Sequence, residues 1–135
     1  MFPQGKPLLR PVDESGERPI FILIEDCVYS SREQGLEITA PKNFLTDGAS
    51  VPRDLVAWNI AGGYGLSAAV FHDYLYQTGA QPKDVADKLF LEILLEIGVA
   101  EWRANLMYVA VVEVGGWFYN EPKHAALKVR LGIIY

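Results

Sequence analysis

The hydrophobic pattern of the chain changes from strand-like to helical near residue 66. Residues 19–29 are rich in β-branched and aromatic side chains, and a second strand-like segment covers residues 36–39. Residues 30–35 between them suit a turn, so the two segments predict a β-hairpin. Residues 1–19 hold four of the eight prolines, which predicts an extended N-terminal arm with little regular structure.

The second half of the chain is dominated by helical periodicity. Three segments show it: residues 66–76, 82–97 and 100–114. Gly79 separates the first two, Gly98 ends the second, and residues 127–134 alternate like a final strand. Because the strands precede the helices instead of alternating with them, the predicted fold is α+β. We expect a single domain over residues 1–135, in which an N-terminal β-hairpin is followed by an antiparallel three-helix core.

Composition and charge narrow the class of protein. Half of the residues are hydrophobic and 21% are charged, which is enough apolar surface for one core. Twelve basic and seventeen acidic residues give a net charge of −5, so a basic face for nucleic acid is not expected. The single cysteine, Cys27, excludes an internal disulfide and favours a reducing compartment, where it would be an inert core residue.

Neither secretion nor membrane insertion is expected from the sequence. Prolines 3 and 7 interrupt the N-terminal stretch in which a signal peptide needs an unbroken apolar region. The longest apolar stretches, residues 20–24 and 106–112, fall well short of the roughly 20 residues that span a bilayer. We therefore expect no secretion signal and no transmembrane segment.

The most informative polar residues are His72 and Asp73, which stand side by side in an otherwise apolar helical segment. An unpaired charge buried there would cost several kcal/mol, so partners are expected. Neighbours on a helix point about 100° apart, so these two side chains can serve different subsites, whereas Tyr76 shares the face of His72.

Asp87 on the next helical segment is the expected partner of His72. The short connection over residues 77–81 makes the two helices antiparallel neighbours, which places Asp87 within reach of His72 and Tyr76. A carboxylate bound to one imidazole nitrogen fixes the tautomer and stabilises the imidazolium that forms when the other nitrogen takes a proton. His72, Asp87 and Tyr76 are therefore the candidate catalytic residues.

A second candidate site involves oxygen ligands. Asp47 and Gly48 lie in a loop between Pro41 and Pro52, and they offer a carboxylate and an exposed backbone carbonyl. These are the hard ligands that calcium prefers, and Asp73 could complete the set. Zinc is disfavoured because its catalytic sites are rich in nitrogen or sulfur ligands.

Each candidate also has a purely structural interpretation. His72 and Asp73 could be a hydrogen-bonded pair that orders the core, and Asp47 could only shape a turn. We expect Asp84 to be solvated or to cap a helix, and His124, beside a lysine, to be exposed and without a role.

The aromatic residues near the C-terminus leave a similar choice. Trp117, Phe118 and Tyr119, together with Trp58, are expected to belong to the core or to a partner surface rather than to a lipid-facing belt.

Several sequence blocks together resemble a family of short uncharacterised proteins encoded by phages, prophages and bacteria. They are Thr-Asp-Gly-Ala-Ser-Val-Pro from residue 46, His-Asp-Tyr-Leu-Tyr from residue 72, and the Asp84 to Phe90 spacing. Gly98, Tyr108 and Gly115 continue the pattern, which covers about residues 20–118. The resemblance implies location in the cytoplasm of a host cell or in a virion.

The same blocks are more distantly similar to secreted bacterial phospholipases of the A2 type. That similarity implies a phospholipase-A2-like helical core in which His72 is the general base, oriented by Asp87 and Tyr76. It also implies that Asp47, the Gly48 carbonyl and Asp73 bind calcium, and that calcium polarises an ester carbonyl. Unlike those enzymes, this chain has one cysteine, no expected signal, and a β-hairpin before the loop.

Two functions therefore follow from the sequence. The first is a phage- or prophage-associated calcium-assisted hydrolase, acting on a lipid or on another ester or amide. The second is a non-enzymatic virion structural or host-interaction module that contacts a virion or host protein.

Overall fold

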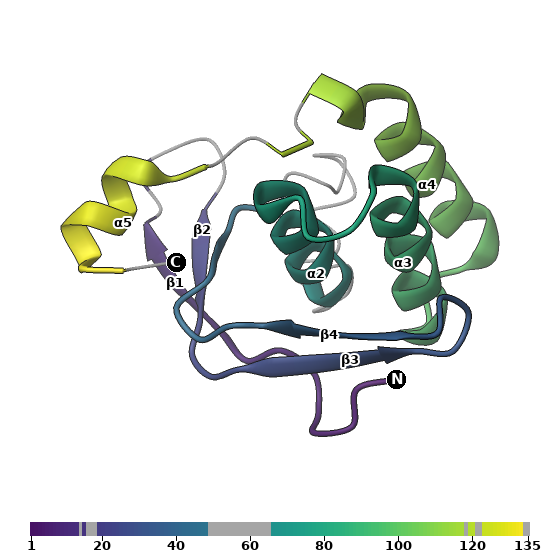
Figure 1. Ribbon diagram of the computed structural model, residues 1–135, viewed down its shortest axis with the longest axis horizontal. Coiled ribbons are helices and arrows are strands. Elements are labelled where there is room, and N and C mark those ends of the chain that lie inside the picture. Colours follow the sequence, from purple (N-terminus) through teal and green to yellow (C-terminus); the bar gives the residue numbers. More distant parts are fainter. Residues whose placement is uncertain (14, 16–18, 49–65, 118, 121–122, 134–135) are drawn as a thin grey trace.

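The computed structural model describes residues 1–13, 15, 19–48, 66–117, 119–120 and 123–133 (Figure 1). Its strands are β1 Leu9–Asp13, β2 Ile20–Leu23, β3 Cys27–Ser31, β4 Leu36–Ala40 and β5 Leu45–Thr46. Its helices are α2 Leu66–Thr78, α3 Lys83–Glu96, α4 Glu101–Val114, the short 3₁₀ helix η1 Gly115–Trp117, and α5 Ala125–Leu131. The strands come first and the helices follow, which confirms the α+β class.

The predicted hairpin is formed by β3 and β4, which pair antiparallel with Tyr29 opposite Ile38. Alternate side chains of β3 and β4 are buried, so one face of the hairpin packs on the core. The strand expected over residues 19–29 is interrupted, because Glu25 and Asp26 are exposed between β2 and β3. In Figure 1 this hairpin runs beneath α2 and α3.

A three-stranded antiparallel sheet in the order β1-β2-β5 makes up the rest of the β structure. Its strand β1 lies within the segment predicted to have little regular structure, so that expectation was wrong for residues 9–13. Pro11 is opposite Phe21 in this pairing. A proline is tolerated there because β1 is an edge strand, whose outer side needs no ladder hydrogen bond.

The three predicted helices are present as α2, α3 and α4. Helix α2 is the most enclosed, and it packs against α3 as well as against β4 and β5. Helix α4 lies on the outer side of α3, as Figure 1 shows. Pro82 immediately precedes α3, and Gly98, with a φ of +96°, follows its end as expected.

The predicted C-terminal strand is wrong, because residues 125–131 form helix α5. Leu127 is buried with Ile22 and Leu45, whereas Val129 is 82% exposed, so the apolar residues do not share one sheet face. A short alternating segment does not distinguish a strand from a helix that buries one residue per turn. Among the described residues, no helix combines the length and the apolar character needed to cross a membrane.

Candidate functional site

The polar residues of α2 lie in the interior of the molecule. His72 is 2% exposed and Asp73 is 3% exposed, on a helix that buries ten of its thirteen residues. The ring of His72 packs against the rings of Tyr76 and Phe90, with centroids 4.0 and 4.9 Å away. Polar groups enclosed in this way need hydrogen-bond partners from the protein or from ordered water.

Asp87 of α3 joins His72 and Tyr76 through one carboxylate oxygen. Oδ1 lies 2.8 Å from Nε2 of His72 and accepts a hydrogen bond from the hydroxyl of Tyr76 at 2.5 Å. Because Asp87 is ionised, Nε2 of His72 must carry the proton that it donates. The structure thus brings together the three residues that the sequence singled out as catalytic candidates.

Lys83 completes this network from the first turn of α3. Its Nζ donates to Oδ2 of Asp87 at 2.6 Å and to the carbonyls of Val111 and Val112 at 3.3 Å. Lys83 thereby ties the last turn of α4 to the buried carboxylate. Lys83 was not among the residues predicted for the site, although its i,i+4 spacing from Asp87 is a recognisable signal.

The network sets the protonation states of Asp87 and Tyr76. Burial by itself raises the pKa of Asp87, but hydrogen bonds from His72, Lys83 and Tyr76 outweigh it and hold the pKa below its ordinary value. Burial and the hydrogen bond to Asp87 raise the pKa of Tyr76. At neutral pH the pair is therefore a carboxylate and a protonated phenol.

Gly115, directly after α4, makes room for the hydroxyl of Tyr76. A Cβ atom built on Gly115 would overlap that hydroxyl, whereas one on Gly116 would meet nothing within 4 Å. The close approach of the chain therefore requires glycine at position 115. In the sequence, Gly115 is part of the pattern that resembles the uncharacterised family, and its contact with Tyr76 was not predicted.

The residues predicted to hold calcium gather around Thr46. The hydroxyl of Thr46 donates to Oδ2 of Asp73 at 2.5 Å and accepts a hydrogen bond from the backbone N–H of Gly48 at 3.3 Å. Gly48 has a φ of +68°, which suits the turn after β5. Residues 49–51 of the same loop lie outside the described residues. Thr46 was not singled out by sequence analysis as a site residue.

His124 also belongs to this region, contrary to the expectation that it is exposed. Its side chain is 11% exposed, and its Nε2 lies 3.9 Å from Oδ2 of Asp47. Burial lowers its pKa below the ordinary value, while Asp47 and Asp73 act in the opposite direction. The sequence could not indicate this contact, because positions 47 and 124 are 77 residues apart in the chain.

The donor chemistry of this second cluster is of the kind that calcium binds. Asp47 and Asp73 supply carboxylate oxygens and Gly48 a carbonyl oxygen, on segments that the Thr46 hydroxyl joins. In the described part of the chain, no three His, Cys, Asp or Glu side chains are arranged to hold a metal ion. A calcium ion here would therefore depend on backbone carbonyls and water as well as on side chains, and calcium binding stays a prediction.

The remaining candidates are Asp84 and the aromatic residues. Asp84 is exposed in the first turn of α3 and does not cap it, which leaves the solvated interpretation. Tyr119 is half-buried and donates its hydroxyl proton to the carbonyl of Gln81 at 2.7 Å. Trp58, Phe118 and the side chain of Trp117 lie outside the described residues.

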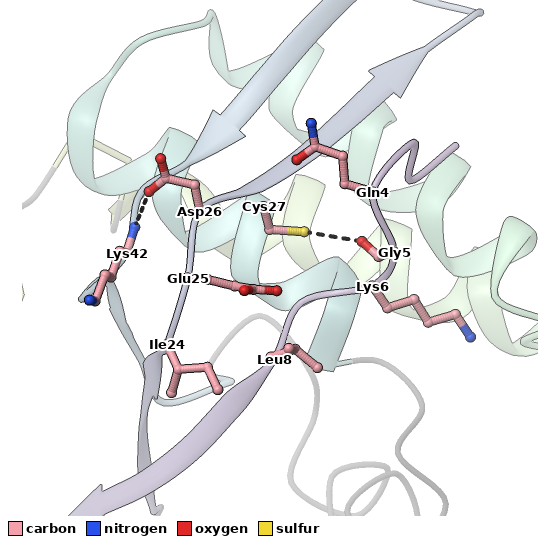
Figure 2. Close-up of a pocket in the computed structure, with 9 residues that line it drawn as sticks. All are labelled: Gln4, Gly5, Lys6, Leu8, Ile24, Glu25, Asp26, Cys27 and Lys42. Atoms are coloured by element: carbon pink, nitrogen blue, oxygen red, sulfur yellow. Dashed lines mark hydrogen bonds between the residues drawn. The ribbon is translucent and has the colours of Figure 1, made fainter.

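A separate surface hollow of about 540 Å³ lies beside Cys27, between the N-terminal segment and the start of β3 (Figure 2). The thiol of Cys27 points to the carbonyl of Gly5 at 3.5 Å. Burial and the nearby Glu25 raise the pKa of this thiol to about 11. Cys27 is thus a protonated core residue, which argues against a reactive role for this hollow.

Comparison with known proteins gives one family. The model of a family described as "Protein of unknown function (DUF1353)" matches residues 21–111, which is more than half of the chain. The matched segment contains all six predicted site residues. No curated protein and no solved structure matches the chain. In agreement with the expectation of an uncharacterised family, the chain belongs to the DUF1353 family of proteins of unknown function.

Proposed function

We propose that this protein is a hydrolase of esters or amides in which His72 acts as the general base. The observation that carries the proposal is the bond between Nε2 of His72 and the buried carboxylate of Asp87. A base needs a fixed ring orientation and a partner for the charge that it acquires, and Asp87 supplies both. Tyr76 donates to the same oxygen and so fixes the position of the carboxylate.

In this proposal each residue of the network has a part in the reaction. Because Nε2 of His72 donates to Asp87, Nδ1 would take the proton from water, and the water oxygen would attack the carbonyl carbon. Asp87 would stabilise the imidazolium, which would then deliver the proton to the leaving alcohol or amine as the carbon–oxygen or carbon–nitrogen bond breaks. Lys83 and Tyr76 would keep Asp87 ionised and in place throughout.

Asp47, the Gly48 carbonyl and Asp73 would hold calcium in this proposal. Bound calcium would supply positive charge beside the carbonyl oxygen as negative charge develops on it. Asp73 follows His72 directly on α2, so the base and the ion would act from adjacent positions of one helix. The distant similarity of the sequence blocks to secreted bacterial phospholipases A2 is what suggests this assignment.

Hydrolysis can be tested with 4-nitrophenyl butyrate as an ester probe and a 4-nitroanilide as an amide probe. We expect His72→Gln to lower the single-turnover rate by about 10²–10⁴-fold, the range for loss of a general base. Asp87→Asn should also lower the rate, because the amide cannot stabilise the imidazolium. Asp84→Asn is the matched control, since Asp84 is exposed on the same helix. Circular dichroism would establish that each variant is folded, and equal rates in wild type and folded His72→Gln would refute the proposal.

Thermal unfolding tests calcium binding independently of the rate assay. We expect millimolar calcium to raise the Tm of the wild type but not that of Asp73→Asn, because a ligand that binds only the folded state stabilises it. Asp84→Asn should respond like the wild type. Equal Tm values with and without calcium would contradict the metal site and leave the role of His72 to the rate assay.

The second candidate function, a virion structural or host-interaction module, is favoured by the completeness of the same network. Both oxygens of Asp87 are occupied, and Lys83 extends the contacts to α4. Such a network can hold α2, α3 and α4 together without any chemistry. Folded His72→Gln and Asp87→Asn variants with wild-type rates on both probes would favour this alternative.

A further inference from the structure

Gln77, near the end of α2, carries a buried oxygen atom that accepts no hydrogen bond from any described residue. The residue is 8% exposed, and its Nε2 donates to the carbonyl of Leu45 at 3.5 Å. Because a carbonyl can only accept, Nε2 must be the amide atom that faces Leu45, which leaves Oε1 without a donor. A buried acceptor of this kind is unfavourable and points to a ligand or a water that satisfies it.

Gln77 lies on the same side of α2 as Asp73, the residue predicted to bind calcium. Side chains four residues apart are neighbours on a helix surface. Both reach β5, and they do so at adjacent residues. Asp73 accepts a hydrogen bond from the hydroxyl of Thr46 at 2.5 Å, and Gln77 donates to the carbonyl of Leu45. The amide of Gln77 and the carboxylate of Asp73 therefore share the boundary between α2 and β5.

A second buried atom without a hydrogen-bond partner among the described residues lies at the same segment. It is Nε2 of His124, which is 3.9 Å from Oδ2 of Asp47 and so beyond hydrogen-bond distance. Leu127, one helical turn after His124, is buried in one cluster with Leu45. Two unsatisfied polar atoms thus adjoin residues 45–48, which is the pattern expected where a polar ligand binds.

We propose that Oε1 of Gln77 is a further ligand of the calcium ion held by Asp47, Gly48 and Asp73. This inference rests on the calcium-assisted hydrolase proposed above. Calcium takes roughly six to eight oxygen ligands, and the amide oxygens of Asn and Gln are among them. Acidic side chains in the described part of the chain do not form a metal site by themselves, so a neutral oxygen beside them adds a ligand that the set needs.

The chemistry of an amide oxygen also explains why glutamine suits this position. The carboxylates of Asp47 and Asp73 balance the two positive charges of calcium, and a neutral third side chain keeps that balance. A third carboxylate in a place this enclosed would add an uncompensated buried charge. An amide oxygen is a hard ligand, which favours calcium over metals that prefer nitrogen or sulfur.

The alternative is that Gln77 only ties α2 to β5 through Leu45. The distance of 3.5 Å exceeds the usual 2.7–3.2 Å of an N–H···O bond, so this contact is weak. Such a role would also use only one of the two polar atoms of the amide and leave Oε1 buried. A residue that served only this contact should affect stability and leave calcium binding unchanged.

Isothermal titration of calcium chloride into the protein tests the assignment. Gln77→Met keeps a side chain of similar length and volume but removes the oxygen. We expect it to weaken calcium binding by about tenfold or more, the scale seen even for groups that act through a metal ligand. Gln4→Met is the matched control, because Gln4 is exposed and lines the separate hollow beside Cys27. Equal affinities of wild type and Gln77→Met would overturn the proposal.

Thermal unfolding in EDTA separates a ligand from a structural residue. Gln77→Met removes an unsatisfied acceptor, so without calcium its Tm should equal or exceed that of the wild type. A lower Tm in EDTA with unchanged calcium affinity would instead show that Gln77 only ties α2 to β5. Gln77→Glu keeps an oxygen and should bind calcium at least as tightly as the wild type, but in EDTA it should be less stable because its charge is buried.

The same measurements distinguish this inference from the calcium site as a whole. If calcium raises the Tm of the wild type and of Gln77→Met equally, but not that of Asp73→Asn, then the site stands and Gln77 is not a ligand. If calcium does not bind to the wild type, the site and the assignment of Gln77 both fail. The role of His72 is decided in either case by the rate assay.

Discussion

Helices α2 and α4 depart from the usual helix pattern in opposite ways. Helix α2 carries His72 and Asp73 into the interior, whereas α4 carries Trp102 and Leu106 out to solvent. In an ordinary surface helix, polar residues face water and apolar residues face the core. Helix α2 thus holds a polar cluster in the interior, and α4 holds apolar side chains at the surface.

The buried polar side chains of α2 and the exposed apolar side chains of α4 differ in whether they need specific partners. The polar groups of α2 are matched by specific partners, of which Asp87 is the most connected. Apolar groups on α4 need no partner, because a single exposed apolar side chain has a small cost. A buried polar cluster is therefore sensitive to single substitutions, while an exposed apolar face tolerates them in the monomer.

The largest expected effect is that of Asp87→Ala on the polar interior of α2. Loss of the carboxylate leaves Lys83 and His72 without their shared partner, which should lower the free energy of unfolding by about 3–5 kcal/mol. Urea denaturation measures this change. Asp84→Ala on the exposed side of α3 is the control and should change stability by less than about 0.5 kcal/mol. Similar values for the two variants would show that α2 does not depend on this network.

A smaller effect is expected at Gly115, where the end of α4 meets Tyr76 of α2. The added methyl group of Gly115→Ala would overlap the Tyr76 hydroxyl and should destabilise the fold by about 1–3 kcal/mol. Gly116→Ala is the matched control, because open space surrounds that position. Chemical denaturation of both variants compares them, and equal stabilities would argue against the close approach of Gly115 and Tyr76.

The smallest expected effect is on the pH dependence of the free energy of unfolding, to which His124 contributes. Its pKa is lowered by burial, so below the ordinary value of 6.5 the unfolded chain binds a proton that the folded chain does not. Stability that is present above that pH is therefore lost as the pH falls toward the folded pKa. Asparagine tolerates the φ of +61° at this position, so His124→Asn should reduce this loss.

The measurement is the unfolding free energy of wild type and His124→Asn at about pH 7.5 and about pH 5.5, either side of the histidine reference value. The wild type should lose more stability than the variant between these values. An identical loss in both proteins would assign the pH dependence to other groups.

The catalytic candidates were accessible to sequence analysis because their geometry is local to two helices. The spacing of His72 and Tyr76, together with a short connection to α3, was sufficient to predict their contact with Asp87. The i,i+4 spacing of Lys83 and Asp87 was visible in the sequence, but the contacts of Lys83 with carbonyls of α4 were not. The sequence also could not show that Gly115 leaves space for the hydroxyl of Tyr76, because this contact joins two different helices and has no periodicity.

By itself the sequence determined the class of fold, the β3–β4 hairpin, three of the helices and the pair of helices that hold His72 and Asp87. These follow from periodicity and from short connections, which act over a few residues. Only the tertiary structure decided that residues 9–13 form an edge strand, that residues 125–131 form a helix and that His124 lies beside Asp47. Such contacts join positions far apart in the chain, and their energies depend on burial that exists only after the chain has folded.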